Sequence, residues 1–306
     1  MTAPSTADAD DLPPPSNVRS AAIERGIQTP TDDRLADPAV LNVVVAGTTA
    51  TTEGAPADID RVDGAYHGSD AGVVGRLAAT IAGLNGDGPG CLHYPEPIET
   101  AAGPWLVIEP LEGRIATVSA GRGRVWVTVE RSNSAAGGQL ASTDEAITAV
   151  LEAARPTHEH YPVTTDSAGV FTTGMTTFEL EGITVEDELT ILFGVTTTPA
   201  TTATEVEARF TAVPAVERCV YESIIDVDRA EPPEGLRTAV ETAHRTVTED
   251  AVYEWLPRPT QLSRLPTTRK MALGTGRSDD AVFDATAYDR CRRLIAETLA
   301  EWRGRR

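Results

Sequence analysis

The chain has 306 residues, with 26 Lys plus Arg against 46 Asp plus Glu, which gives a formal net charge of −20. Such a surface repels phosphate backbones, and no basic stripe with interleaved aromatic residues is present, so nucleic-acid binding is not expected. No apolar run approaches the roughly 18 residues of a membrane span, and the first residues lack the charged start and apolar middle of a signal peptide. We therefore expect a cytoplasmic protein of about two domains, with no membrane partner.

The composition also carries information about the solvent. Only one of the 26 basic residues is a lysine, Lys270. At molar salt the Debye length falls to about 3 Å, so dense surface carboxylates no longer repel one another strongly. The acidic composition therefore favours adaptation to a salt-rich cytoplasm over an acidic surface that serves a basic partner. Three widely spaced cysteines, at 91, 219 and 291, predict neither a disulfide framework nor a Cys-based zinc site.

The spacing of apolar residues predicts alternating strands and helices in the first and last thirds of the chain. Residues 1–36 are acidic, Pro-rich and poor in large apolar side chains, so we expect a disordered lead-in. Buried strands are predicted at 41–45, 105–108 and 270–274, and helices at 73–84, 236–247 and 288–302.

The middle third follows a different order of elements. Strands are predicted at 125–129, 178–180, 189–195 and 220–225, and helices that begin with capping boxes at 142–151 and 202–210. The order strand, helix, strand, strand, helix, strand is that of a ferredoxin-like α/β sandwich. We therefore predict an α/β fold with a discontinuous body, residues 37–118 and 228–306, and a sandwich domain inserted at 119–227.

Several short motifs follow one another between about residues 40 and 300. They are D-G-A-Y-H-G at 63–68, V-I-E-P at 107–110, G-R-G-R at 121–124, S-N-S-A at 132–135 and L-G-T-G at 273–276. Their order resembles that of the zinc aminoacylase and carboxypeptidase family, which includes acetylornithine deacetylase and succinyl-diaminopimelate desuccinylase. The resemblance implies a body of the zinc-peptidase type, with the inserted domain acting as a lid.

The same resemblance implies a dinuclear zinc site, in which His and carboxylate ligands surround the metals at about 2.0–2.2 Å and a Glu acts as general base. This sequence departs from the family at those positions. Thr-rich residues 48–52 replace the first metal motif, residues 277–286 contain no histidine, and Asn133 stands where the lid histidine is expected. Glu99 and Glu109 are the carboxylates that remain as candidate metal or catalytic residues.

We therefore predict a catalytically degenerate protein of this family, which has no zinc cofactor and serves as a ligand-binding or regulatory protein. Asp70, His67 and Asn133 are the candidate binding residues for a small amino-acid-like ligand. Because the lids of the family commonly pair edge to edge, the resemblance also implies a homodimer through the inserted domain.

Two other hypotheses stay open. The first is an active metal-dependent amide hydrolase with a rearranged zinc site, built from Asp70, Glu99 and Glu109 with His67 or His93. The second is an unrelated small-molecule binding protein, which predicts no sandwich insert.

The remaining histidines have simpler interpretations. His158 and His160 flank a carboxylate, but Pro156 and Pro162 on either side favour an exposed loop over a metal site. His244 lies beside the apolar stripe of its predicted helix and is interpreted as a boundary residue.

Overall fold

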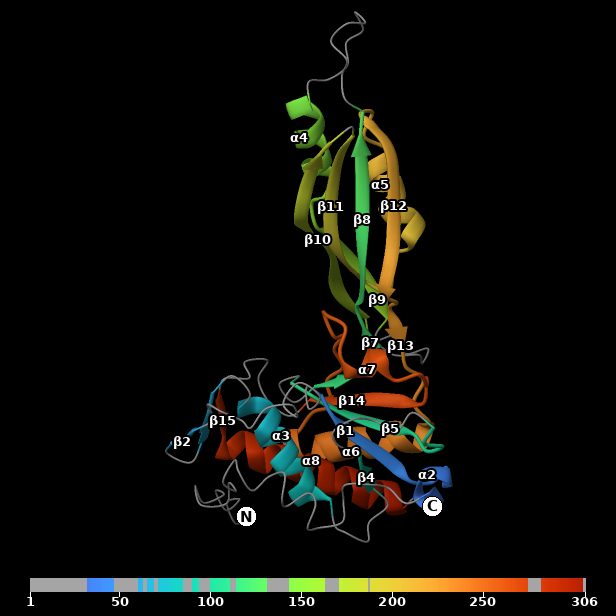
Figure 1. The fold of residues 1–306 in the computed structure, drawn as a ribbon. Coiled ribbons are helices and arrows are strands. Elements are labelled where there is room, and N and C mark those ends of the chain that lie inside the picture. Colours follow the sequence, from blue (N-terminus) through green and yellow to red (C-terminus); the bar gives the residue numbers. More distant parts are fainter. Residues whose placement is uncertain are drawn as a thin grey trace, which may run out of the picture. The chain divides into compact units, whose positions relative to one another are not determined.

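The computed structural model describes residues 32–46, 60–62, 65–68, 71–84, 90–93, 100–110, 114–130, 143–162, 171–186, 188–274 and 282–304. The chain divides into two compact units (Figure 1). The body comprises the described residues within Met1–Thr117, Ala230–Glu254 and Arg264–Arg306, and the lid those within Val118–Arg229 and Trp255–Ser263. The predicted α/β fold is confirmed, and each unit is described by itself below.

The body is built on a five-stranded sheet with the order β4-β1-β5-β14-β6. The strands are β1 (Leu41–Val45), β4 (Gly90–Leu92), β5 (Trp105–Glu109), β6 (Ile115–Ala116) and β14 (Lys270–Gly274). The first four in spatial order are parallel, and β6 runs antiparallel to β14. Every residue of β1, β5 and β14 is buried, which explains why these strands appear in the sequence as nearly continuous apolar runs.

Three helices cover the body sheet: α3 (Ala71–Gly83), α6 (Glu234–Thr248) and α8 (Ala285–Gly304). Helix α8 packs against both α3 and α6, and all three contribute to one apolar core (Figure 1). Helix α3 is buried nearly all round, and its small residues allow this close packing. A Cβ at Gly75 would lie 2.1 Å from the Phe283 ring. All three helices lie where the apolar spacing predicts them.

Two parts of the body differ from the sequence-based expectations. A short helix, α2 (Asp32–Ala36), occupies the last residues of the segment expected to be disordered, and the Leu35 carbonyl accepts a hydrogen bond of 2.8 Å from the Ala102 backbone N–H. The rest of that segment lies outside the described residues. A second sheet has the order β15-β3-β2, and it was not predicted because its strands are so short. These strands are β2 (Asp60–Val62), β3 (Ala65–His67) and β15 (Val282–Asp284).

The lysine of β14 is deeply buried in the body sheet. Lys270, the first residue of β14, is 1% exposed, and its Nζ donates a hydrogen bond of 2.7 Å to the Leu265 carbonyl oxygen. This bond offsets part of the cost of taking the amine out of water.

The lid contains an antiparallel sheet with the order β12-β8-β11-β10-β9. Its strands are β8 (Gly121–Val129), β9 (Thr157–Pro162), β10 (Phe171–Val185), β11 (Leu189–Thr197) and β12 (Val216–Ile225), and its helices are α4 (Thr143–Ala153) and α5 (Ala203–Thr211). Both helices pack on the face of the sheet that carries Val125, Val127 and Val129. The four predicted strands and two predicted helices occur in the predicted order, with β9 as an additional strand between α4 and β10. The capping box between Thr202 and Glu205 is confirmed.

Strand β9 corrects one prediction. The His158–His160 triplet was expected in an exposed loop because prolines flank it, but residues 157–162 pair with the first half of β10. Strand β9 is an edge strand, and proline is tolerated at edges because one side of such a strand needs no N–H donor. Proline at both ends therefore limits the strand without preventing it.

Smaller elements complete the lid. The short strands β7 (Val118–Ser119) and β13 (Asp228–Arg229) pair with each other, and α7 (Gln261–Arg264) follows the segment that begins at Trp255. Among the described residues, no helix combines the length and the apolar character needed to cross a membrane.

Candidate functional site

The candidate site lies at the carboxyl edge of the parallel strands of the body, where open α/β sheets bind their ligands. Glu109 is the last residue of β5 and pairs in register with Gly274, the last residue of β14. Its side chain is 1% exposed. Pro110 follows directly and cannot donate to the ladder, which explains why β5 ends here. The structure thus places the predicted carboxylate at the end of a central strand.

His67 approaches the same edge from a different element. It ends β3, four residues before α3 begins at Ala71, and the Ala71 backbone N–H donates a hydrogen bond of 3.2 Å to the Gly68 carbonyl. Gly68 has φ 141°, a conformation that side chains with a Cβ rarely adopt. Helix α3 connects the parallel neighbours β1 and β4, so its N-terminus lies at the carboxyl edge. The topology therefore brings His67 and Glu109 to one edge.

His93 directly follows the last residue of β4, and its backbone N–H donates a hydrogen bond of 2.8 Å to the Val43 carbonyl. Its Nε2 is 2.8 Å from Asn42 Oδ1, and its ring centroid is 4.4 Å from that of Trp105, the first residue of β5. Burial lowers the pKa of His93 to about 4, so its imidazole is neutral at physiological pH. Glu109 is four residues after Trp105, about 13 Å further along β5 at the usual rise of a strand, so the His93 ring is turned toward the start of β5 and not toward Glu109. A zinc site that combines His93 with Glu109 is therefore not supported.

The other three histidines belong to other elements. His158 and His160 belong to β9 of the lid. His244 lies on α6, fully buried rather than at the boundary, with its Nδ1 3.4 Å from Thr248 Oγ1. Burial lowers the pKa of His244 to about 4. Among the three histidines of the body, His67 is the partly buried one, whereas His93 and His244 are buried.

Several predicted site residues lie outside the described residues, namely Asp70, Glu99, Asn133 and the Thr-rich residues 48–52. The buried pair of Asn42 and His93 was missed by the motif comparison. The signal was present in the sequence, because Asn42 is a polar residue inside the otherwise apolar run of β1.

Of the dinuclear zinc centre that the resemblance implies, the described residues at this edge supply one carboxylate, Glu109, and one partly buried imidazole, His67. Such a centre needs several imidazoles and carboxylates within about 2.0–2.2 Å of the metals. Two of the five imidazoles are buried in the body, and two belong to β9. Within the described part of the chain, no group of three or more His, Cys, Asp or Glu residues is arranged to hold a metal ion.

Comparison with models of protein families gives no match, and no curated protein matches the sequence. Solved structures match over most of the chain. The tripeptidase of Staphylococcus aureus has a TM-score of 0.56 at 11% identity, covering 86% of this chain and 81% of that chain. The M20 family metallo-carboxypeptidase Sso-CP2 of Sulfolobus solfataricus has a TM-score of 0.52 at 9% identity, covering 86% and 85%. The YXEP protein of Bacillus subtilis, a dinuclear metal-binding peptidase of the M20 family, has a TM-score of 0.51 at 12% identity, covering 95% and 91%. This chain therefore has the fold of the M20 family peptidases.

Proposed function

We propose that this chain is a non-hydrolytic protein on the M20 peptidase fold, which binds a small amino-acid-like ligand at the carboxyl edge of the body sheet. The observation that carries the proposal is the placement of the histidines. The imidazoles of His93 and His244 are buried with lowered pKa values, that of His93 against Asn42 and Trp105, and His158 and His160 belong to a lid strand. Within the body, this leaves one imidazole, that of His67, for a centre that requires several.

The groups at the edge suit binding better than hydrolysis. A metal-dependent hydrolase of this kind needs metal ions to generate an attacking hydroxide at neutral pH. The buried carboxylate of Glu109, in contrast, offers an acceptor for a charge-assisted hydrogen bond from an ammonium group. His67 is only partly buried and can contact a second polar group of the same ligand.

Metal content and activity test this proposal. Protein purified without chelators and then dialysed against zinc is expected to retain less than one zinc per chain by plasma mass spectrometry. It is also expected to release no product from N-acyl amino acids or dipeptides. Calorimetric titration with free amino acids is expected to show binding that Glu109→Gln weakens about tenfold, since a hydrogen bond to a charged group contributes about 1.5–3 kcal/mol.

The opposite results identify the alternative function. Stoichiometric zinc together with amide hydrolysis, both lost in Glu109→Gln, would replace the proposal with an active metal-dependent hydrolase. The far-ultraviolet circular dichroism of the variant serves as the control for folding in either case.

We further propose that two copies of the chain pair through the lid, as the lids of the resembling family do. Strand β9 pairs with β10 only as far as Thr176, and among the described residues no strand pairs with that edge of β10 from Thr177 to Val185.

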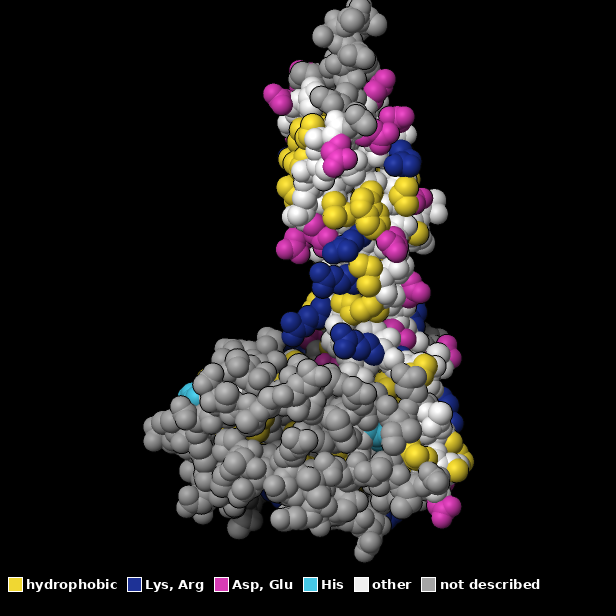
Figure 2. All heavy atoms as spheres, in the orientation of Figure 1, with side chains coloured by type: hydrophobic (Ala, Val, Ile, Leu, Met, Phe, Trp, Pro, Cys, Tyr) yellow, Lys and Arg dark blue, Asp and Glu magenta, His cyan; other side chains and the backbone are white. Residues whose placement is uncertain are grey.

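Exposed apolar side chains accompany this edge: Leu180 (47%), Ile183 (44%) and Val185 (62%) on β10, and Leu151 (40%) on α4. Hydrophobic side chains are visible there in Figure 2, at the border of the lid where Figure 1 places β10. An open edge with apolar neighbours is a template for pairing with another strand.

Light scattering after size exclusion in molar potassium chloride is expected to give twice the mass of one chain. The double variant Ile183→Glu/Val185→Glu is expected to weaken dimerisation about 100-fold, because each lost apolar contact occurs twice in a symmetric dimer. The matched control is Val220→Glu/Ile224→Glu on β12, at the other edge of the sheet, where the two side chains are exposed to a similar extent (44% and 52%). A monomeric wild type, or equal loss in both variants, would count against pairing through β10.

A further inference from the structure

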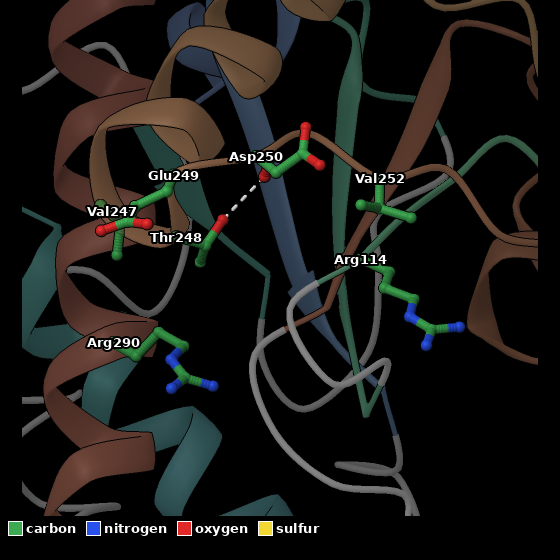
Figure 3. Close-up of a pocket in the computed structure, with 7 residues that line it drawn as sticks. All are labelled: Arg114, Val247, Thr248, Glu249, Asp250, Val252 and Arg290. Carbon is green, nitrogen blue, oxygen red and sulfur yellow. Dashed lines mark hydrogen bonds between the residues drawn. The ribbon is translucent and has the colours of Figure 1, made fainter.

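The body contains a pocket of about 420 Å³ between the C-terminal end of α6, the segment that follows it, and α8 (Figure 3). This volume is within the usual range for small-molecule sites. Arg114 and Arg290 contribute positive charge, Val247 and Val252 apolar surface, and Thr248 a hydroxyl group. The Gly274 backbone N–H donates a hydrogen bond of 2.7 Å to the Arg114 carbonyl, so Arg114 is fixed next to the end of β14.

Local hydrogen bonds hold the wall of the pocket that follows α6. The Thr248 hydroxyl is 2.8 Å from both the His244 and the Asp250 carbonyl oxygens. The Asp250 carboxylate accepts a hydrogen bond of 2.8 Å from the Ala251 backbone N–H. Figure 3 shows this carboxylate turned away from Arg290. The carboxylate of Asp250 therefore hydrogen-bonds within its own loop and does not neutralise the charge of Arg290 across the pocket.

Arg290 differs from the arginines that follow it on α8. Arg292 forms an ion pair of 2.6 Å with Asp289, and Arg293 lies 3.9 Å from the same carboxylate. Arg290 extends its guanidinium toward the open space of the pocket (Figure 3), and no carboxylate among the described residues lies within ion-pair distance of it. In a chain with a net charge of −20, an arginine that faces a cavity without such a partner points to an anionic ligand.

The other residues of the pocket narrow the class of anion. Val247 is half-buried and Val252 is 43% exposed, so both offer apolar surface that an inorganic oxyanion would leave uncovered. Glu249 also lines the pocket, and its negative charge disfavours a second negative charge on the ligand. Arg114 is already paired with Glu254 at 2.6 Å and adds positive potential on the opposite wall.

We propose that this pocket binds a small aliphatic monocarboxylate. Its carboxylate forms charge-assisted hydrogen bonds with Arg290, and its apolar body packs against Val247 and Val252. This site is separate from the carboxyl-edge site of Glu109, and it does not depend on whether the chain hydrolyses amide bonds.

Saturation-transfer NMR and calorimetric titration of the full chain with isovalerate test the proposal, at a constant chloride concentration so that competition from chloride is equal for all samples. Arg290→Gln is expected to weaken isovalerate binding at least about tenfold, since hydrogen bonds to charged groups contribute about 1.5–3 kcal/mol. Val252→Ser is expected to weaken it by a smaller factor. Succinate and inorganic phosphate are expected to bind more weakly than isovalerate. Arg292→Gln, two residues further along the same helix and paired with Asp289, is the matched control and should bind as the wild type does.

The proposal would be overturned if isovalerate did not bind to the wild type, if Arg290→Gln kept the wild-type affinity, or if phosphate bound as tightly as isovalerate. Glu109→Gln is expected to leave isovalerate binding unchanged. Loss of binding in that variant would show that isovalerate binds at the carboxyl-edge site, and it would also overturn this assignment. Failure of the amino-acid titration alone would affect only the function proposed for Glu109.

Discussion

Lowering the pH from 7 to 5 is expected to reduce the free energy of unfolding by about 4 kcal/mol through two buried histidines. Burial lowers the pKa values of His93 and His244 from 6.5 to about 4 in the folded chain. As the pH falls below 6.5, the unfolded chain therefore takes up protons that the folded chain does not, and unfolding becomes more favourable. Each imidazole contributes about 2 kcal/mol over this interval, and the loss continues until the pH reaches about 4.

Chemical denaturation at a series of pH values checks this expectation, with His244→Leu as the informative variant. The Nε2 atom of His244 has no hydrogen-bond partner among the described residues, so leucine removes the titrating group at little other cost. We expect the pH-dependent loss to fall to about 2 kcal/mol in this variant. Comparing the variant with the wild type at each pH cancels the contribution of the carboxylates. An identical pH dependence in both proteins would show that His244 does not titrate as its burial implies.

Gly103→Ala is expected to destabilise the chain by about 3 kcal/mol, near the upper end for the insertion of a methyl group into a packed site. A Cβ at this position would lie 1.9 Å from the Val40 carbonyl oxygen and 2.9 Å from Asn42 Nδ2. The Val40 carbonyl is backbone at the start of β1, where the Asn42 N–H is bonded to the Pro104 carbonyl at 2.9 Å. Neither side can move without breaking the pairing of β1 with β5.

The matched control is Gly182→Ala in β10, where an added Cβ would meet no atom within 4 Å. This variant is expected to stay within about 0.5 kcal/mol of the wild type, as most surface substitutions do. The difference between the two midpoints of thermal unfolding measures the cost of the close approach at Gly103. Equal midpoints would mean that β1 and the segment before β5 can separate enough to accept a methyl group without loss of stability.

The elements that the sequence predicts well are those whose burial leaves a local pattern. Strands β1, β5 and β14 are buried on both faces and appear as apolar runs, and α6 shows its stripe because only one side faces the core. The three-residue strands β2, β3 and β15 are too short to show such a pattern, and the pairing of β15 with β3 joins segments more than 200 residues apart.

The place of a residue in the candidate site can be predicted from the sequence only where that residue stands at the end of a predicted strand. Glu109 follows the apolar run of β5, so its place at the carboxyl edge could be anticipated. The contact of His93 with Asn42 joins residues 51 positions apart and could not be anticipated from spacing. His244 is four residues after Val240 and eight after Leu236, so helical spacing does put it on the buried stripe, and the boundary assignment was wrong on that account.

The seclusion of Lys270 has a practical consequence. It is the only lysine of the chain, and its amine is held 2.7 Å from the Leu265 carbonyl at the beginning of a central strand. Reagents that acylate side-chain amines find no target until that strand separates from its neighbours. The rate of acylation at Lys270 would thus measure the rate at which the body sheet opens, because no other side-chain amine contributes to the signal.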